Sequence, residues 1–392
     1  MKFDFDKVVD RHGTKCLKYD FAKERGRSDD MLPLWVADMD FQTAPGIQKS
    51  LSDAVAHGIY GYSEGKDDYF QAAAGWYEKH FGWKVEKEWL IKTPGVVFAL
   101  AMAVKAYTKE GDAVLLQQPV YYPFSEVITD NHRRLINSPL QQIDGHYEIN
   151  FEEFEQKIVE ENVKLFLMCS PHNPVGRVWK EWELRKLGDI CLKHNVLVVS
   201  DEIHSDFTYG ENIHHVFASL LDEKYAAITT TCTAPSKTFN IAGLQISNIW
   251  ISNPELRARF RAEVTAAGYS QVNLMGLVAC QAAYETGEEW LKELKIYLEG
   301  NLDYVRTFLK ENLPEIKLTE PEGTYLLWLD FKGLGMKEEQ LKDLVENKAK
   351  LWLDSGAMFG PDGEGFERIN IACPREILKQ ALTQLAESVH DR

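Results

Sequence analysis

Short apolar runs recur between amphipathic stretches through the middle of this 392-residue sequence. The runs are AVLLQ (113–117), VKLFLMC (163–169), VLVVS (196–200), AAITTT (226–231) and ISNIWIS (246–252). Uninterrupted apolar runs of this length are typical of strands buried on both faces. Patterns between them, such as VVFALAMAVKAYTKEG and EWELRKLGDICLKHN, are typical of helices. The alternation predicts an α/β domain built on a mainly parallel sheet that is flanked by helices.

The pattern changes after about residue 270, where long helical stretches precede the apolar run YLLWLDF and a glycine-rich turn near 360–365. This change predicts a second, smaller α+β domain. We expect residues 46–290 to form the large domain and residues 291–392 the small one. We expect the amino-terminal segment, residues 1–45, to belong to the small domain.

Composition excludes several classes of protein. The 44 basic and 60 acidic side chains give a net charge of −16, so a nucleic-acid backbone is an unfavourable partner. No uncharged apolar run reaches the roughly 18 residues that a membrane span needs, and the start MKFDFDKVVDRHGTK does not resemble a leader. The six cysteines are scattered without metal-ligand spacing. We therefore expect a cytoplasmic protein with reduced core cysteines, no metal site and no membrane or nucleic-acid partner.

Ligands of such folds bind where strands end and helices begin. In IKTPGVVFALAMAV (91–104), Gly95 opens a helix directly after a strand and leaves the amides of Val96 and Val97 free. Free amides at a helix start form an anion site that suits a phosphate. The alternative is a simple helix start after a Pro-Gly turn.

Two further junctions carry polar residues after buried strands. In SPHNPVG (170–176), two prolines and a glycine fix the loop that holds Asn173, whose amide can donate to a phenolate oxygen. In SDEIHSD (200–206), Asp201 follows the apolar run VLVVS, and a carboxylate there needs a charged or donating partner. The alternatives are a rigid turn for the first segment and a structural ion pair for the second.

The last junction, TAPSKTFNIAGLQ (233–245), places Lys237 among small, hydroxylated and apolar residues. Partial burial lowers the pKa of a lysine, which favours formation of a Schiff base. A surface lysine in a loop is the alternative.

The four junctions follow one another in the order phosphate site, ring-oxygen donor, ring-nitrogen partner and Schiff-base lysine. Spacings of 28 and 36 residues separate Asn173, Asp201 and Lys237. This combination resembles the fold type I pyridoxal-phosphate enzymes of the aspartate-aminotransferase superfamily over nearly the whole chain. LPLWVADMDF, YGYSEG, SPHNPVG, DEIHSD and APSKTFNIAGLQ are similar to motifs of its cystathionine β-lyase group, typified by the MalY and PatB proteins. The resemblance implies a seven-stranded sheet and the cofactor pyridoxal 5'-phosphate.

The resemblance also implies roles at the cofactor ring. Lys237 would bind the cofactor and act as the base that takes the α-proton. Asp201 would pair with the ring nitrogen, and Asn173 would donate to the ring oxygen. Tyr121 would stack on the ring, with Tyr122 as the competing candidate.

Other roles concern the phosphate and the substrate. The amides of Val96 and Val97 and the hydroxyl of Ser236 would hold the phosphate. Arg368 would bind the substrate carboxylate with its two-pronged guanidinium, beside Asn173 and Tyr121. Tyr62 would reach the phosphate from the neighbouring subunit, which implies a homodimer.

Two positions depart from the pattern of many aminotransferases. His204 stands where a tyrosine often follows the ring-pairing acid, and we expect it to contact the cofactor. Gln245 replaces an arginine that often lies near the phosphate. Both changes match the lyase group. We therefore expect a carbon-sulfur β-lyase that acts on L-cystathionine or a related cysteine S-conjugate. An aminotransferase and an additional regulatory, protein-binding role are the alternatives.

Overall fold

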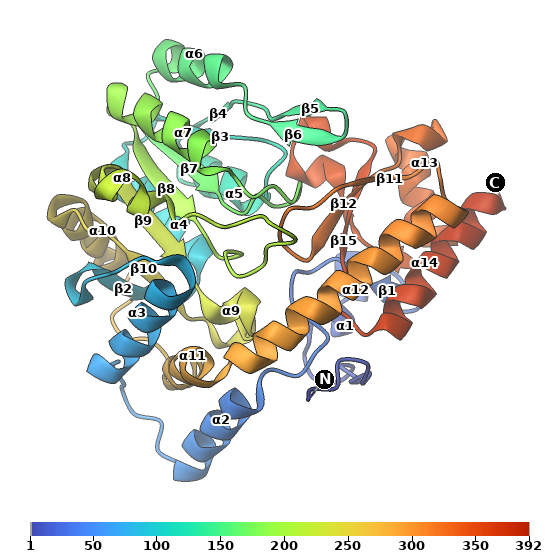
Figure 1. Cartoon of the computed structure of the whole chain (residues 1–392), viewed down its shortest axis with the longest axis horizontal. Coiled ribbons are helices and arrows are strands. Elements are labelled where there is room, and N and C mark those ends of the chain that lie inside the picture. Colours follow the sequence, from blue (N-terminus) through green and yellow to red (C-terminus); the bar gives the residue numbers. More distant parts are fainter. Residues whose placement is uncertain (1, 392) are drawn as a thin grey trace.

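A computed structural model describes residues 2–391 and contains one large, seven-stranded sheet (Figure 1). The sheet order is β2-β10-β9-β8-β7-β3-β4. In that order the strands are β2 (Leu90–Thr93), β10 (Ser247–Trp250), β9 (Thr229–Thr233), β8 (Leu197–Asp201), β7 (Leu165–Cys169), β3 (Ala113–Leu116) and β4 (Arg134–Asn137). Only β10 runs antiparallel to its neighbours within this sheet. The predicted mainly parallel seven-stranded sheet is confirmed.

Both faces of this sheet are buried, which explains why its strands read as continuous apolar runs. Along β7, Leu165, Leu167 and Cys169 pack into one core, while Phe166 and Met168 pack into another. The first core is covered by α4 (Val96–Tyr107), α5 (Pro123–Thr129) and α10 (Pro254–Ala266). The second is covered by α6 (Phe151–Glu161) and α7 (Glu181–Lys193). The helices therefore flank the sheet on both sides.

Further elements surround this domain. They are α2 (Pro45–His57), α3 (Asp67–Phe81), α8 (Leu220–Glu223), α9 (Pro235–Thr238), α11 (Leu274–Thr286) and the hairpin of β5 (Gln141–Ile143) and β6 (His146–Glu148). Within residues 2–391, no helix combines the length and the apolar character needed to span a bilayer.

A second, antiparallel sheet has the order β11-β12-β15-β14. Its strands are β11 (Lys317–Thr319), β12 (Leu326–Asp330), β14 (Asp354–Ser355) and β15 (Phe366–Asn370). The long helix α12 (Glu288–Asn312) runs from beside α11 toward this sheet and packs with α14 (Arg375–His390) (Figure 1). The short helix α13 (Glu338–Lys342) lies nearby. This arrangement is the predicted smaller α+β unit.

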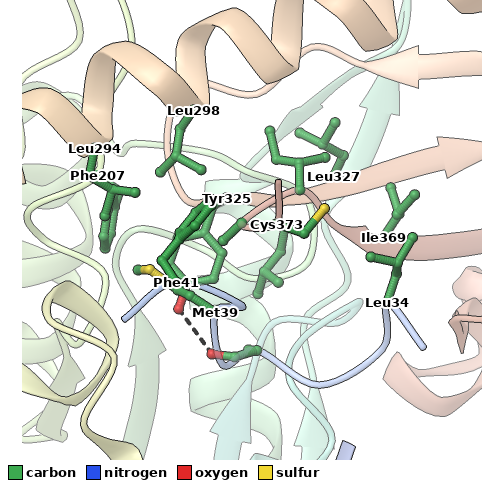
Figure 2. Packing of buried hydrophobic residues seen from close by; sticks show 14 of the residues in the cluster. Leu34, Met39, Phe41, Phe207, Leu294, Leu298, Tyr325, Leu327, Ile369 and Cys373 are labelled. Carbon is green, nitrogen blue, oxygen red and sulfur yellow. Dashed lines mark hydrogen bonds between the residues drawn. The ribbon is translucent and has the colours of Figure 1, made fainter. Parts of the chain in front are cut away.

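The first part of the amino-terminal segment lies against the second sheet. It contains α1 (Leu17–Asp20) and β1 (Leu32–Pro33), which pairs in parallel with β13 (Leu351–Trp352). Leu34, Met39 and Phe41 enter the same core as Leu298 of α12 (Figure 2). The segment then crosses from the small sheet to the edge of the large one, and it forms part of the site described below.

Candidate active site

The carboxyl ends of β2, β3, β7, β8 and β9 meet at one edge of the large sheet, because these strands run in the same direction. A cavity of about 230 Å³ opens there. Eight of the predicted residues line it: Val96, Val97, Tyr121, Asn173, Asp201, His204, Ser236 and Lys237. A wider outer cavity of about 640 Å³ shares Ala37, Tyr121 and Lys237 with this inner cavity and contains Arg368.

One wall of the inner cavity is the start of α4. Gly95 precedes the helix with a backbone φ of +148°, a value that residues with a side chain rarely adopt, and no side chain of the described residues caps the helix. The first amides of a helix have no intrahelical acceptor, so those of Val96 and Val97 are available to an anion. Ser236, half-buried, lines the same cavity. This wall has the donors that a phosphate group requires.

Lys237 lies in the short helix α9, and its ammonium donates to the carbonyl oxygen of Ala37 at 3.0 Å. Burial lowers the pKa of Lys237 to about 8, although the charge of Asp38 opposes the shift. A fraction of this amine is therefore neutral, and nucleophilic, near neutral pH. The following residue, Thr238, donates its hydroxyl to Asp206 at 2.6 Å, which fixes α9.

Asp201 ends β8 and is buried at the floor of the inner cavity. Burial raises its pKa to about 7, although the amide of Ile203, which donates to the carboxylate at 3.1 Å, opposes this rise. A nearby cation would favour the ionised form. The site therefore offers a carboxylate that would be satisfied by a protonated ring nitrogen.

His204 is buried beside these groups, and its Nδ1 has no hydrogen-bond partner among the described residues. Burial lowers the pKa of His204 to about 3, with Lys237 and Arg368 adding to the effect. The imidazole is thus neutral at physiological pH. Its ring packs edge-on against Tyr325, 5.8 Å between centroids.

Asn173 lines the inner cavity and contacts Arg368, which lines the outer one. Its carbonyl accepts from the amide of Tyr121 at 3.0 Å, and its side-chain oxygen accepts from Nη1 of Arg368 at 3.1 Å. The side-chain NH₂ remains as the group that can donate into the inner cavity. Tyr121 lines both cavities, and its ring centroid lies 5.1 Å from that of Tyr122.

Arg368 lies on β15, and its guanidinium is almost fully buried. Nη2 donates to the carbonyl of Trp35 at 2.9 Å and forms an ion pair with Asp354, its register partner on β14. Nε is buried without a partner among residues 2–391. Arg368 therefore lines the outer cavity with an internal counter-ion, while its buried Nε has no acceptor among the described residues.

Of the predicted site residues, Tyr62 is the one that lines neither the inner nor the outer cavity in the single chain. Its side chain is 95% exposed and lines a surface hollow of about 780 Å³. Pro94 and Gln245 line both this hollow and the inner cavity, so the two are adjacent. That Tyr62 of one subunit reaches the phosphate in the site of a neighbouring subunit stays a prediction.

Sequence reasoning missed three contributors: the carbonyl of Ala37, Asp206 and Asp354. The carbonyl accepts from both Lys237 and Tyr325, the latter at 2.9 Å (Figure 2). Asp354 follows the apolar run LWL. The argument used for Asp201, that a carboxylate after an apolar run needs a partner, could have identified it.

The fold and the cavity are those of the aminotransferase superfamily, with a half-buried lysine beside a buried aspartate and a free helix start. Residues 30–385 match the family "Aminotransferase class I and II", and the chain belongs to that family.

Similar proteins refine this assignment. Cystathionine beta-lyase PatB of Bacillus subtilis is 44% identical over 97% of this chain and 98% of its own. The structure of cystalysin from Treponema denticola, which contains a pyridoxal 5'-phosphate cofactor, matches with a TM-score of 0.96 and 38% identity, covering 100% of both chains. A pyridoxal-phosphate-bound putative aminotransferase from Clostridium difficile matches with a TM-score of 0.96 and 43% identity, covering 99% of this chain and 100% of that one. The predicted resemblance to the lyase group is confirmed.

Proposed function

We propose that this protein is a pyridoxal-phosphate-dependent carbon-sulfur β-lyase. It converts L-cystathionine or a related cysteine S-conjugate, together with water, to pyruvate, ammonia and a thiol. The observation that carries the proposal is the amine of Lys237, with a pKa lowered to about 8, in one cavity with the buried carboxyl of Asp201. The similarity to proteins named as lyases supports the reaction type.

The residues of the inner cavity fit the cofactor. The amides of Val96 and Val97 and the hydroxyl of Ser236 supply phosphate donors, and Lys237 supplies the amine that binds the aldehyde. Asp201 can keep the ring nitrogen protonated. When bound, the cofactor withdraws electrons from the α-carbon of an amino acid.

The remaining side chains position the ring and the substrate. The side-chain oxygen of Asn173 already accepts a hydrogen bond from Arg368. The side-chain NH₂ group of Asn173 is therefore the group that can donate to the oxygen of the cofactor ring. Tyr121 lines both cavities and can stack on the cofactor ring. The neutral imidazole of His204 lines the inner cavity and can contact the cofactor there. Arg368, in the outer cavity, can bind the α-carboxylate.

Lys237 is suited to move the α-proton. An amine with a pKa near 8 can accept a proton at neutral pH and remain a competent acid afterwards. In the overall reaction the bond between Cβ and sulfur breaks, and the sulfur leaves with the electron pair. Water then replaces nitrogen in the three-carbon fragment, so no oxidant or reductant is required.

A homodimer completes the proposal. Val55, Ile59, Tyr60 and Tyr62 form a group of large, exposed side chains next to the hollow that adjoins the inner cavity. Exposed groups of this kind mark protein interfaces. The position of the hollow supports the delivery of Tyr62 from a second copy of the chain to the phosphate.

We also propose the domain division 1–45, 46–290 and 291–392, with the first and last parts together forming the small domain. The pairing of β1 with β13 supports the joining of these parts, and the start of α2 at Pro45 supports the first boundary. The boundary near residue 290 lies in the first turn of α12. A cytoplasmic location fits the six unpaired cysteines.

The test follows pyruvate and free thiol from L-cystathionine without any added keto acid. We expect sustained release of both in equal amounts. Negligible thiol release, together with rapid amino transfer once a keto acid is added, would overturn the lyase proposal in favour of an aminotransferase.

A further inference from the structure

The outer cavity is larger than the inner one, and a loop of the amino-terminal segment forms part of its wall. Arg11, Lys15, Cys16 and Leu17 all line it. Lys237 also lines the inner cavity and Arg368 is almost fully buried, so these two residues mark the part of the outer cavity nearest to the proposed chemistry. The loop can then face the part that the leaving half of a substrate occupies.

This loop is fixed at both ends. The guanidinium of Arg11 pairs with Asp38 at 2.6 Å and with Asp40 at 2.7 Å, and the buried ammonium of Lys18 pairs with Asp40 at 2.8 Å. These acids belong to the same stretch of chain as Ala37, which contacts Lys237. The loop therefore has a defined position relative to the reacting groups.

The tip of the loop has a specific, unfavourable backbone conformation. Lys15 has a φ of +62°, in the left-handed region that non-glycine residues rarely occupy. The carboxylate of Asp20 stabilises this turn by accepting from the amide of Gly13 at 2.8 Å and from that of Cys16 at 2.9 Å. The turn holds Lys15 at the rim of the cavity.

The charges of the lining leave one cation without a partner. Its cations are Arg11, Lys15, Lys237 and Arg368, and its acids are Asp38, Asp40 and Asp354. Asp38 and Asp40 pair with Arg11 and with Lys18, which lies outside the lining, and Asp354 pairs with Arg368. Lys237 would be bound to the cofactor. Among the described residues, the ammonium of Lys15 has no hydrogen bond or ion pair, and Lys15 is exposed to solvent while it lines the outer cavity.

We propose that Lys15 binds an anionic group on the leaving-thiol half of the substrate. The enzyme then prefers cysteine S-conjugates whose thiol carries a carboxylate, as cystathionine does, over uncharged conjugates. This inference rests on the proposed lyase function, since it assigns the far end of the same cavity. Lys15 does not bind the α-carboxylate of the substrate, because Arg368 binds that group elsewhere in the outer cavity.

Two substrates that differ only in charge test the proposal. S-(2-carboxyethyl)-L-cysteine carries a carboxylate where S-(2-carbamoylethyl)-L-cysteine carries a neutral amide of the same shape. In the wild-type holoenzyme we expect kcat/KM to favour the acid about three- to fivefold, as for an exposed ion pair, and high salt to reduce the preference. Lys15→Met is expected to bring the ratio to about one, and Lys15→Glu to reverse it.

Lys7→Met is the matched control, because Lys7 is exposed on the same segment and is not part of the lining. It is expected to leave the ratio unchanged. An equal ratio in wild type and Lys15→Met would overturn the inference.

Dissociation constants of the two conjugates, measured by calorimetry, separate this inference from the lyase proposal. If neither conjugate releases thiol, the lyase proposal fails, while the ratio of dissociation constants still decides the role of Lys15. A ratio that favours the acid in wild type and is lost in Lys15→Met supports binding by Lys15. An unchanged ratio refutes it.

Discussion

The buried ion pair between Arg368 and Asp354 allows us to predict how much stability the Asp354→Asn variant loses. Both side chains are at most 4% exposed, and the substitution keeps the shape while it removes the counter-charge. Loss of one partner of a buried pair costs about 3–5 kcal/mol. The new amide can still accept a hydrogen bond from the guanidinium, worth about 1.5 kcal/mol, so a net loss of about 1.5–3.5 kcal/mol is expected.

This loss of unfolding free energy lowers the melting temperature by a calculable amount. An unfolding entropy of roughly 2.1 cal/mol/K per residue over 392 residues gives about 0.8 kcal/mol/K, so the variant is expected to melt about 3 °C below wild type. The exposed pair of Arg306 and Asp303 is the matched control. Asp303→Asn is expected to shift the melting temperature by less than about 1 °C, because exposed pairs contribute little.

A second measurement distinguishes this reasoning from general damage to the fold. In wild type, a ligand carboxylate meets a guanidinium that Asp354 already neutralises, whereas in the variant it supplies the missing charge. L-alanine, which has no leaving group, is therefore expected to bind Asp354→Asn about tenfold more tightly or better, as read from cofactor absorbance. Unchanged or weaker binding, or a melting temperature equal to that of wild type, would refute the assigned competition for Arg368.

Three further predictions concern the inner cavity. Lys237→Ala is expected to lose the absorbance of the lysine-bound cofactor and almost all turnover; a coloured and active variant would refute the assignment. Because the pKa of Lys237 is about 8, cofactor capture by the cofactor-free protein should rise with pH from about one tenth of its maximum at pH 7 and level off near pH 9. A tenfold rise per pH unit that continues beyond pH 9.5 would show an ordinary lysine. Mixing inactive Lys237→Ala and Tyr62→Ala subunits should restore part of the activity; if Tyr62→Ala is inactive and no mixture recovers, Tyr62 does not act across a dimer.

The sequence was sufficient to predict the large sheet and the residues that gather at its edge. Asn173, Asp201 and Lys237 each lie at or soon after the end of a buried strand, and the carboxyl ends of parallel strands necessarily lie together. The antiparallel direction of β10 was not predictable, because an apolar run has the same pattern in either direction. The sequence therefore predicted that this segment is a strand of the large sheet but did not predict its direction.

Contacts between segments that are far apart in the sequence could not be predicted from local sequence patterns. The carbonyl of Ala37 meets Lys237 across 200 residues of chain, and a backbone acceptor leaves no signature in side-chain chemistry. Asp354 meets Arg368 through strand register, which short strands do not specify. Tyr62 was assigned by resemblance alone, and one chain places it on the surface.

The crossing of the amino-terminal segment has a consequence for biosynthesis. Asn370 donates its side-chain NH₂ to the carbonyls of Val36 and Asp38, each at 2.7 Å, and β1 pairs with β13. Residues 32–38 are thus held by residues 351–370, so a ribosome must synthesise the chain at least as far as Asn370 before the wall containing Ala37 can form. Until then Met39 and Phe41 lack part of their packing, and the nascent chain exposes an apolar segment that chaperones can bind. Cofactor binding in this protein is therefore expected only after Asn370 has been synthesised and has met the segment that contains Ala37.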